Sequence, residues 1–291
     1  MPQQQPHDTK ALAPLETLYD AARGTAIELP PELAALYGDL WLSPPAERPL
    51  VFANFVSTLD GVVALDEPGY EGGGAISGFN RHDKAVMGLL RAVSDAVVVG
   101  AGTLRSVPKS IWTAESIFPP LAGAYAALRT ALGKPAVPLN VIVTARGTVD
   151  LALPVFASGK VPALIVTTPE GAARLAGETL PPSVGVAAGH AASQVSAGDV
   201  LDAVRAARPN ATAVLVEGGP HLMAAFFNER LADELFLTLA PQAAGRDAAH
   251  KRFGLVEGAL YLPEHPLKAA LLSVKRSQDH LFLRYDFAAD R

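Results

Sequence analysis

Segments with the patterns of strands and helices alternate between residues 139 and 239, and this alternation constrains the fold more than any other feature. Short apolar runs bounded by turn residues predict strands, and the segments between them have helical spacing. Alternating strands and helices form a mainly parallel sheet with helices on its faces, so the sequence predicts an α/β fold. The predicted strands are 139–144, 163–168, 184–187, 213–217 and 234–239, and the predicted helices are 170–175, 199–207 and 220–228.

The flanking segments extend this pattern. A strand is predicted at 50–57, and Asn80 followed by Asp83 is the asparagine version of a capping box, which predicts a helix start. The buried face of that helix consists of Val86, Leu89, Leu90 and Val93. Further elements are a strand at 96–99, a helix at 124–132 closed by Gly133, and an antiparallel hairpin at the sheet edge formed by 268–275 and 280–287 with 276–279 as its turn.

Residues 1–48 differ in composition from the rest of the chain. The first eight are polar, with prolines and three glutamines, and are expected to be disordered. Two short helical stretches are expected between Leu15 and Leu42, the clearer one after Pro30-Pro31, and a proline-rich linker follows at 43–49. We therefore expect an N-terminal extension of residues 1–48 on a main body of residues 49–291.

Composition excludes several classes of function. The net charge is -5 and the pI is about 5.8, whereas a nucleic-acid-binding protein needs clustered Lys and Arg. There is no cysteine, which excludes disulfides, thiolate metal sites and a cysteine nucleophile. The N-terminus lacks the pattern of a signal peptide and no apolar run is long enough to span a membrane. We expect a cytoplasmic protein that binds neither nucleic acid nor membranes.

Two strand ends carry glycines where a helix begins. The strand at 96–99 continues into Gly100, Gly102 and Thr103, and the strand at 213–217 ends on Glu217 before Gly218-Gly219-Pro220. In parallel α/β sheets, ligands bind outside the carboxyl ends of strands, where helix N-termini favour phosphate. Taken alone, each corner is better explained as an ordinary strand-to-helix turn, for which glycine is the usual residue, and neither has the G-x-G-x-x-G spacing of a Rossmann fingerprint.

Single polar residues follow two other strands. Asp60 comes directly before Gly61, where a carboxylate can orient a substrate or move a proton, although Asp-Gly is also a common turn. Thr144 ends a strand and Arg146 follows it, where an arginine can bind the 2′-phosphate that distinguishes NADPH from NADH. A solvated loop arginine is an equally good interpretation.

Other catalytic patterns are absent from the sequence or weak. The seven histidines never occur at i, i+4 or in H-E-x-x-H, so no metal site is predicted. There is no G-x-S-x-G elbow. Ser106-Val107-Pro108-Lys109 matches S-x-x-K, but its proline disfavours the required helix and the S-D-N and K-T-G partners are absent.

Four ordered motifs between residues 50 and 287 resemble the pyrimidine-reductase family of riboflavin biosynthesis, which has a dihydrofolate-reductase-like fold. The four stretches are Ser57-Thr58-Leu59-Asp60-Gly61 for S-x-D-G; Leu89-Leu90-Arg91 with Asp95 to Arg105 for L-R…D-A-x-x-V-G-x-G-T-x-R; Val216 to Leu222 for V-E-G-G-P-x-L; and Leu231 to Leu235 with Ala240-Pro241 and Gly245 for L-x-D-E-L…A-P…G.

The resemblance implies an NADPH-dependent reductase that delivers a hydride to a 5-amino-6-(5-phosphoribosylamino)uracil-type pyrimidine, with residues 49–291 as the reductase domain. It also implies a homodimer, with which an exposed apolar strand such as 281–287 is compatible. By the same resemblance Asp60 is the catalytic candidate, and Ser57, Asp60, Arg105 and Lys109 lie on the substrate side. The implied cofactor residues are Gly100, Gly102, Thr103, Leu104, Glu217, Gly218, Gly219, Pro220, His221 and Leu222, with Thr144 and Arg146 as additions.

The chain departs from the family pattern on the substrate side. Val62 stands where a basic residue usually follows D-G, and Ser106-Val107-Pro108-Lys109 replaces A-D-D-P or A-D-N-P. The zinc ligands H-A-E and P-C-x-x-C of the family's deaminase domain are absent from this sequence, so we expect no deamination. Three interpretations therefore stay open: reduction of the riboflavin intermediate, reduction of another acceptor such as dihydrofolate or a pterin, and NADPH binding without turnover.

Overall fold

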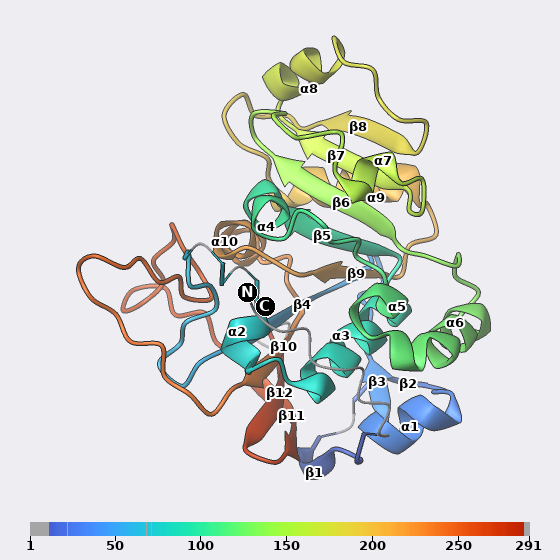
Figure 1. The fold of residues 1–291 in the computed structure, drawn as a ribbon, viewed down its shortest axis with the longest axis vertical. Helices are drawn as coiled ribbons and strands as arrows, with labels where there is room; N and C mark the ends of the chain where they lie inside the picture. The colour runs from blue at the N-terminus through green and yellow to red at the C-terminus, as the bar shows by residue number, and fades with distance from the viewer. Residues whose placement is uncertain (1–11, 22, 68, 71, 288–291) are drawn as a thin grey trace.

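The computed structural model describes residues 12–287 except 22, 68 and 71, so the disorder expected for residues 1–8 lies outside the described part. Its centre is a ten-stranded sheet with the order β1-β11-β12-β10-β4-β9-β5-β6-β7-β8 (Figure 1). The strands from β10 to β8 are parallel, and β12, β11 and β1 are added to them in antiparallel fashion. The predicted α/β class and mainly parallel sheet are confirmed.

The strands are β1 (Glu16–Asp20), β2 (Thr25–Ile27), β3 (Leu40–Leu42), β4 (Leu50–Ser57), β5 (Ala96–Gly100), β6 (Leu139–Thr144), β7 (Ala163–Thr167), β8 (Val184–Ala188), β9 (Ala213–Val216), β10 (Glu234–Leu239), β11 (Ala270–Ser277) and β12 (His280–Asp286). The helices are α1 (Pro31–Tyr37), α2 (Gly74–Ser77), α3 (Arg81–Val93), α4 (Ala101–Ser106), α5 (Ala114–Ile117), α6 (Ala122–Ala131), α7 (Pro154–Ala157), α8 (Pro169–Leu175), α9 (Ala197–Ala207) and α10 (Pro220–Asn228), with a 3-10 turn at Pro119–Leu121.

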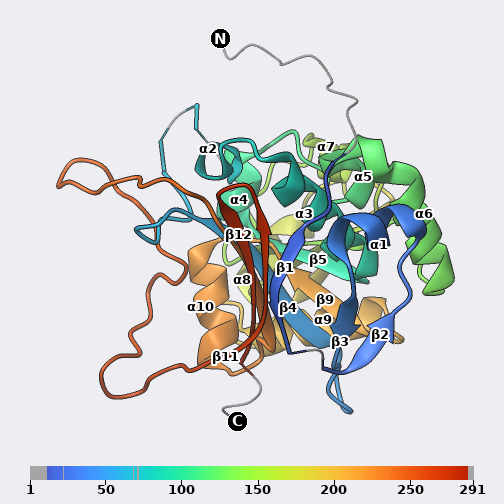
Figure 2. The same cartoon turned by 90° about the horizontal axis from the view of Figure 1, so that it is seen from below.

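Helices cover both faces of the parallel strands. The α3, α5 and α6 helices lie on one face, and α9 and α10 lie on the other (Figure 2). Successive strand residues point to opposite faces, so Val97 and Val99 pack under α3 while Ala96 and Val98 pack against α9 and α10. A strand buried on both faces explains the continuous apolar runs in the sequence.

The α3 helix begins as its sequence predicts. The side chain of Asn80 accepts a hydrogen bond from the Asp83 backbone N–H at 3.0 Å, which satisfies a donor that the first turn leaves free. The predicted inward face from Val86 to Val93 is buried. This helix positions two charged side chains, Asp83 and Arg91, beneath the candidate site described below.

One of the two helical stretches expected near the N-terminus is wrong. The segment after Leu15 forms β1, which pairs with β11, and β2 pairs with β3, whereas the second expected helix is confirmed as α1. Pairing with an available strand outweighs the weak helical preference of a short segment. The β3 strand also contacts the main sheet, because the Trp41 carbonyl accepts a hydrogen bond from Arg284 of β12.

The C-terminal hairpin is confirmed, but its position and surface are not as expected. Because β1 pairs with β11, the hairpin lies inside the sheet rather than at its edge. Its turn is shorter than expected, since β11 continues to Ser277 and β12 begins at His280. The strand at 281–287 is not exposed: β12 lies between β10 and β11, and its residues are buried or half-buried. The apolar strand thought compatible with a dimer therefore belongs to the sheet.

Two connections around the sheet edge were predicted only in part or not at all. The helix start expected after β5 is α4, but α5 lies in a stretch whose periodicity gave no clear assignment. Between β10 and β11, residues 240–269 form a long loop without a helix or regular strand, which extends away from the body (Figures 1 and 2). The loop is attached by the bridge between Ala64 and Phe253 and by Arg252, which donates to the Leu65 carbonyl and pairs with Glu67.

Candidate active site

The parallel strands bring the separate motifs to one edge of the sheet. The β4, β9, β5 and β6 strands are neighbours that run in the same direction, so their carboxyl ends lie side by side. Figure 1 shows α2, α4 and α10 gathered at this end. In this type of sheet the carboxyl edge is where ligands bind.

The two glycine corners contact each other directly. The Gly100 N–H donates to the Gly218 carbonyl at 3.1 Å, and the Glu217 N–H donates to the Val98 carbonyl at 3.0 Å. These bonds continue the pairing of β5 with β9 beyond the last regular strand residue. The corners therefore form one structure from which α4 and α10 both begin.

Gly218 requires glycine for reasons within the protein. Its φ is +132°, where L side chains are rarely found. A Cβ atom at this position would lie 2.9 Å from Thr103 Oγ1. At Gly219 the situation is different: φ is -91°, and a Cβ would lie 3.5 Å from Thr103 Oγ1, an ordinary contact. The protein itself thus demands a glycine at 218 but not at 219.

The chain around the corners fits a phosphate-bearing ligand. Gly219 is the N-cap of α10 and Gly100 is the N-cap of α4. The first N–H groups of a helix have no partner within that helix, and the helix dipole adds positive potential at this end. Gly102 is exposed and a Cβ there would meet only Arg105 Nη2, at 3.9 Å, so the space above the first turn of α4 is open.

The side chains of the cofactor candidates are not equivalent. Leu104 is buried in the core beneath α4, so only its backbone can face a ligand. Leu222 packs in the core on the other face of the sheet, the face covered by α9 and α10, and Pro220 is the first residue of α10. His221 is exposed; its Nδ1 lies 3.2 Å from the Glu257 carbonyl and its ring contacts Phe253 edge-on.

Glu217 is bound by an arginine beneath the second corner. The Arg91 guanidinium approaches the Glu217 carboxylate with Nε at 2.9 Å from Oε1 and Nη2 at 2.6 Å from Oε2. Both side chains are almost fully buried, at 5% and 2% exposure. Arg91 Nη1 also donates to the Thr113 carbonyl at 3.0 Å. The pair holds the residue that precedes Gly218-Gly219 in one orientation.

Thr144 and Arg146 lie at the end of β6, next to the first corner. Thr144 is buried and Arg146 is exposed. The turn that carries Arg146 is fixed by its neighbours: the Thr168 hydroxyl donates to the Ala145 carbonyl at 2.7 Å, and a Cβ at Gly147 would lie 2.4 Å from the Gly171 carbonyl oxygen. A rigid turn thus presents an arginine to solvent beside the glycine corners.

Asp60 is tied to the long loop. Its carboxylate accepts hydrogen bonds from the Thr58 hydroxyl at 2.5 Å, the Ala244 N–H at 3.0 Å and the Gly245 N–H at 2.8 Å, and Arg246 donates to the Asp60 carbonyl at 2.8 Å. The Thr58 bond and then the backbone donors hold the pKa of Asp60 well below its usual range. An ionised carboxylate with these partners anchors a loop and has no proton to donate at neutral pH.

Replacing Asp60 with alanine is expected to release the loop. The variant loses the acceptors for Ala244 and Gly245, so trypsin should cut after Arg246, Lys251 or Arg252 severalfold faster than in the wild type, as followed by mass spectrometry. Because the lowered pKa keeps the carboxylate ionised at every pH above the ordinary value for Asp, wild-type protection should not change across the neutral and alkaline range in which trypsin is active. Asp202→Ala, exposed on α9, is the control. Equal cleavage of all three proteins would show that Asp60 does not hold the loop.

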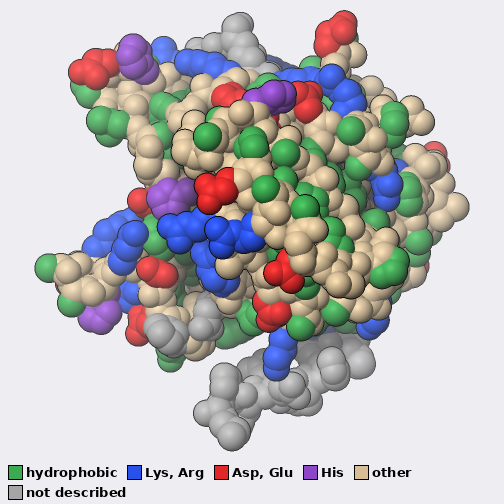
Figure 3. Space-filling model, turned by 90° about the horizontal axis from the view of Figure 1, so that it is seen from above, with side chains coloured by type: hydrophobic (Ala, Val, Ile, Leu, Met, Phe, Trp, Pro, Cys, Tyr) green, Lys and Arg blue, Asp and Glu red, His purple; other side chains and the backbone are tan. Residues whose placement is uncertain are grey.

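The other substrate-side candidates differ in accessibility. Ser57 is buried and its hydroxyl donates to the Thr58 carbonyl at 2.9 Å, so it is engaged with the backbone. Arg105 and Lys109 are exposed on and after α4. Lys and Arg side chains gather on one side of the face shown in Figure 3. The long loop itself carries Arg246, Lys251 and Arg252.

Asp83 is a buried carboxyl beneath the carboxyl edge of the sheet that the sequence analysis interpreted only as part of a helix cap. Burial raises its pKa to about 6. A charged residue on the inward face of α3, in register with Val86 and Leu90, was the available sequence signal.

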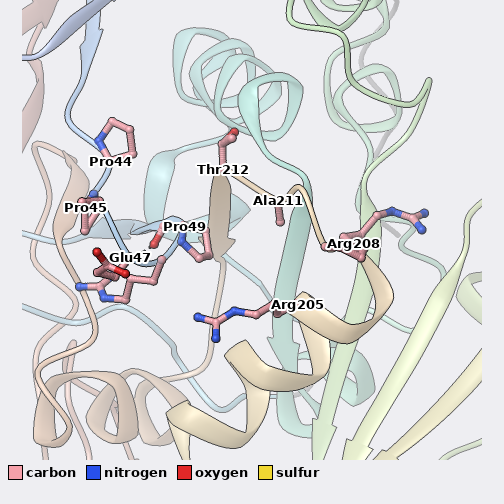
Figure 4. A pocket seen from close by; sticks show the side chains of 11 residues that line it. Pro44, Pro45, Glu47, Pro49, Arg205, Arg208, Ala211 and Thr212 are labelled. Atoms are coloured by element: carbon pink, nitrogen blue, oxygen red, sulfur yellow. Dashed lines mark hydrogen bonds between the residues drawn. The ribbon is translucent and has the colours of Figure 1, made fainter.

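A separate cavity lies at the opposite edge of the sheet. It has a volume of about 320 Å³ and is lined by Pro44 to Pro49 and by residues around the end of α9. Arg205 points into it and Arg208 points away (Figure 4). Arg48, also in its wall, is paired with Asp233 at 2.6 Å. None of the predicted site residues lines this cavity.

In the part of the chain that the structure describes, no group of three or more His, Asp or Glu side chains is placed to hold a metal ion. None of the described helices combines the length and the apolar character needed to cross a bilayer.

Solved structures with the same fold include reductases. A pyrimidine reductase-like protein from Corynebacterium diphtheriae is 20% identical, over 82% of this chain and 91% of that one, with a TM-score of 0.61. A deaminase/5-amino-6-(5-phosphoribosylamino)uracil reductase from Thermotoga maritima is 22% identical over 82% of this chain, which spans 57% of its length, with a TM-score of 0.58. The riboflavin biosynthesis reductase of Saccharomyces cerevisiae is 14% identical, over 84% and 92%, with a TM-score of 0.54. The fold is therefore the dihydrofolate-reductase-like α/β fold that the sequence predicted.

The sequence model of the RibD C-terminal domain matches residues 49–276. A comparison with curated proteins finds no significant match. Because the domain match covers most of the chain, this protein belongs to the RibD C-terminal domain family, the pyrimidine reductases of riboflavin biosynthesis. It is thus an oxidoreductase by family, and the resemblance seen in its four motifs is confirmed.

Proposed function

We propose that this chain is an NADPH-dependent reductase that transfers a hydride to a 5-amino-6-(5-phosphoribosylamino)uracil-type pyrimidine. The observation that carries the proposal is the joined pair of glycine corners. At Gly219 the surrounding protein leaves room for a side chain, yet the residue is glycine. Because neither backbone angles nor packing require glycine at this position, we attribute its presence to a ligand that approaches the backbone closely. The nicotinamide supplies the hydride, and the protein binds and orients both reactants.

The residues around the corners divide into cofactor and substrate sides. On the cofactor side are the residues around the first turn of α4, Gly100, Gly102 and Thr103, and those around the first turn of α10, Gly218 to Leu222. Their backbone N–H groups are the proposed contacts with the cofactor. On the substrate side, Arg105 and Lys109 are exposed cations that suit a phosphate. The Asp60 anchor keeps the long loop beside them, which makes Asp60 a positioning residue in this proposal.

Arg146 is expected to provide the preference for NADPH over NADH. We expect Arg146→Ala to weaken NADPH binding about tenfold, or ~1.4 kcal/mol, with little effect on NADH, because only NADPH carries the 2′-phosphate. The change is measurable by matched titrations that follow the fluorescence of Trp41 and Trp112. Arg174→Ala, an exposed arginine on α8, serves as the control. Equal losses for both dinucleotides would contradict the assignment of Arg146 to the 2′-phosphate.

A second acceptor is kept as an alternative because the departures from the family pattern lie on the substrate side. Val62 stands where family members usually have a basic residue, but it is apolar and fully buried, so it cannot contact the substrate as that basic residue would. A panel containing the aminouracil phosphate, dihydrofolate and a pterin, followed by the loss of NADPH absorbance, separates the acceptors. NADPH binding without oxidation by any of the three would favour the non-catalytic interpretation.

The remaining features of the proposal concern the whole protein. The division into an extension of residues 1–48 and a reductase domain of residues 49–291 stays a prediction, as do a cytoplasmic location, a homodimer and the lack of a nucleic-acid partner. Sedimentation at several concentrations tests the dimer.

A further inference from the structure

The cavity at the amino edge of the sheet has the size of a small-molecule site. Its volume of about 320 Å³ falls within the range of ligand pockets in other proteins. One wall is the linker from Pro44 to Pro49, and the other is the end of α9 with residues 208–212. Pro49 directly precedes β4 and Thr212 directly precedes β9, so the cavity lies at the opposite end of these strands from the glycine corners. A ligand bound here would be separate from the proposed cofactor and substrate.

Arg205 brings to this cavity a positive charge that the protein itself does not use. It lies in the last turn of α9, is exposed, and points into the cavity (Figure 4). Among the described residues it has no hydrogen-bond or ion-pair partner. An arginine near a helix end can serve the helix alone, as Arg208 does: its Nη1 donates to the Ala207 carbonyl at 3.2 Å, and its side chain points away from the cavity. Arg205 makes no such bond, so its guanidinium is available to an anion.

The other charged groups around the cavity restrict where an anion can bind. Arg48 is already neutralised, because its two terminal nitrogens each donate to the Asp233 carboxylate at 2.6 Å. Glu47 is exposed on the linker and has no partner among the described residues, so its carboxylate repels an anion on that side. The favourable place for a negative group is therefore beside Arg205, on the α9 wall.

Much of the remaining lining is apolar and rigid. The apolar lining residues are Pro44, Pro45, Ala46, Pro49, Pro209 and Ala211. Proline has no N–H group to donate and its φ is fixed, so these residues present apolar surface and lose little conformational freedom when a ligand binds. Such a surface suits the face of a ring better than a second polar group.

We propose that this cavity is an accessory binding site for a small organic anion that carries an apolar ring. The anionic group pairs with Arg205, and the ring lies against the prolines of the linker. The inference concerns a site apart from the glycine corners and does not rest on the proposed reductase function. Because the ligand contacts the linker and α9 together, it should also hold the linker against the body of the protein.

Phenyl phosphate is a probe of this class, and isothermal titration calorimetry with the full-length protein measures its binding. We expect saturable binding with a Kd of about 1 mM or below. Inorganic phosphate and benzyl alcohol each lack one half of the probe, and each should bind at least about tenfold more weakly. Raising NaCl from about 0.05 M to about 0.5 M should weaken the binding of phenyl phosphate, because salt screens an exposed ion pair.

Two variants of the cavity should change the affinity in opposite directions. Arg205→Met keeps the apolar stem and removes the charge, so the affinity for phenyl phosphate should fall at least about tenfold. Glu47→Gln removes the repelling carboxylate, so the affinity should rise about two- to threefold. Arg174→Met, at an exposed arginine of α8, is the matched control and should bind as the wild type does. Because Arg205 is exposed and has no partner, Arg205→Met should unfold at the same urea concentration as the wild type.

The outcomes are distinct. A loss of affinity in Arg205→Met together with a gain in Glu47→Gln establishes the site. Equal affinity of Arg205→Met and the wild type would place the anion elsewhere, at cations such as Arg105 and Lys109, and would overturn the inference. Equally tight binding of inorganic phosphate, which would mean an adventitious ion only, or no saturable binding up to about 10 mM, would also overturn it. NADPH titration of Arg205→Met should match the wild type, so failure of the proposed function is recognised separately.

Discussion

Replacing Arg91 with methionine is expected to lower the free energy of unfolding by about 3–5 kcal/mol. The substitution removes the partner of Glu217 and leaves a carboxylate that is 2% exposed without a compensating charge. It also removes the donor to the Thr113 carbonyl. Urea unfolding followed by circular dichroism measures the change, and the m value should stay constant if the folded state remains compact.

A double-variant cycle shows whether the uncompensated charge is the cause. Arg91→Met combined with Glu217→Gln removes the buried charge, so the double variant should regain much of the lost stability. The matched control is Arg174→Met, which breaks the exposed pair with Glu170 at 3.8 Å and should change stability by less than about 0.5 kcal/mol. If the double variant is no more stable than Arg91→Met, the loss comes from packing and not from Glu217.

Replacing Gly219 with valine should abolish NADPH binding without unfolding the protein. The backbone at 219 is extended and an added Cβ meets only Thr103 Oγ1 at ordinary distance, so the side chain is directed into the space at the start of α10. That space is where the proposed function places the cofactor. We expect NADPH affinity to fall at least about 100-fold, or ~2.8 kcal/mol, in the tryptophan fluorescence titration.

The neighbouring glycine provides a contrast. Gly218→Ala should lower stability by about 1–3 kcal/mol, because its φ of +132° and the 2.9 Å approach to Thr103 oppose any side chain. Gly123→Val, at an exposed position of α6 where a Cβ meets nothing within 4 Å, is the control for Gly219→Val. Normal NADPH affinity in a folded Gly219→Val protein would mean that the corner is only a turn, and the reductase proposal would lose its main support.

The sequence alone determined the parallel part of the fold. Strands such as β5 and β9 are continuous apolar runs because helices cover both of their faces, and such runs between amphipathic helices leave little choice of architecture. The start of α3 was also readable, since Asn80 caps the helix through a local hydrogen bond. The motifs at the glycine corners were readable because each is a short contiguous stretch, and in one of them the backbone at Gly218 itself restricts the residue type.

Tertiary structure decided whatever depends on a partner distant in the sequence. The first segment became β1 because β11 was available to pair with it, and that pairing moved the hairpin away from the sheet edge. Asp60 proved to be a loop anchor because residues 244 and 245 donate to it from 184 and 185 positions away. Asp83 resembled a helix-cap residue, whereas in the folded chain its side chain is buried, which raises its pKa to about 6. Local patterns specify backbone geometry, whereas the protonation state of a side chain depends on burial and on neighbours that only the folded chain brings together.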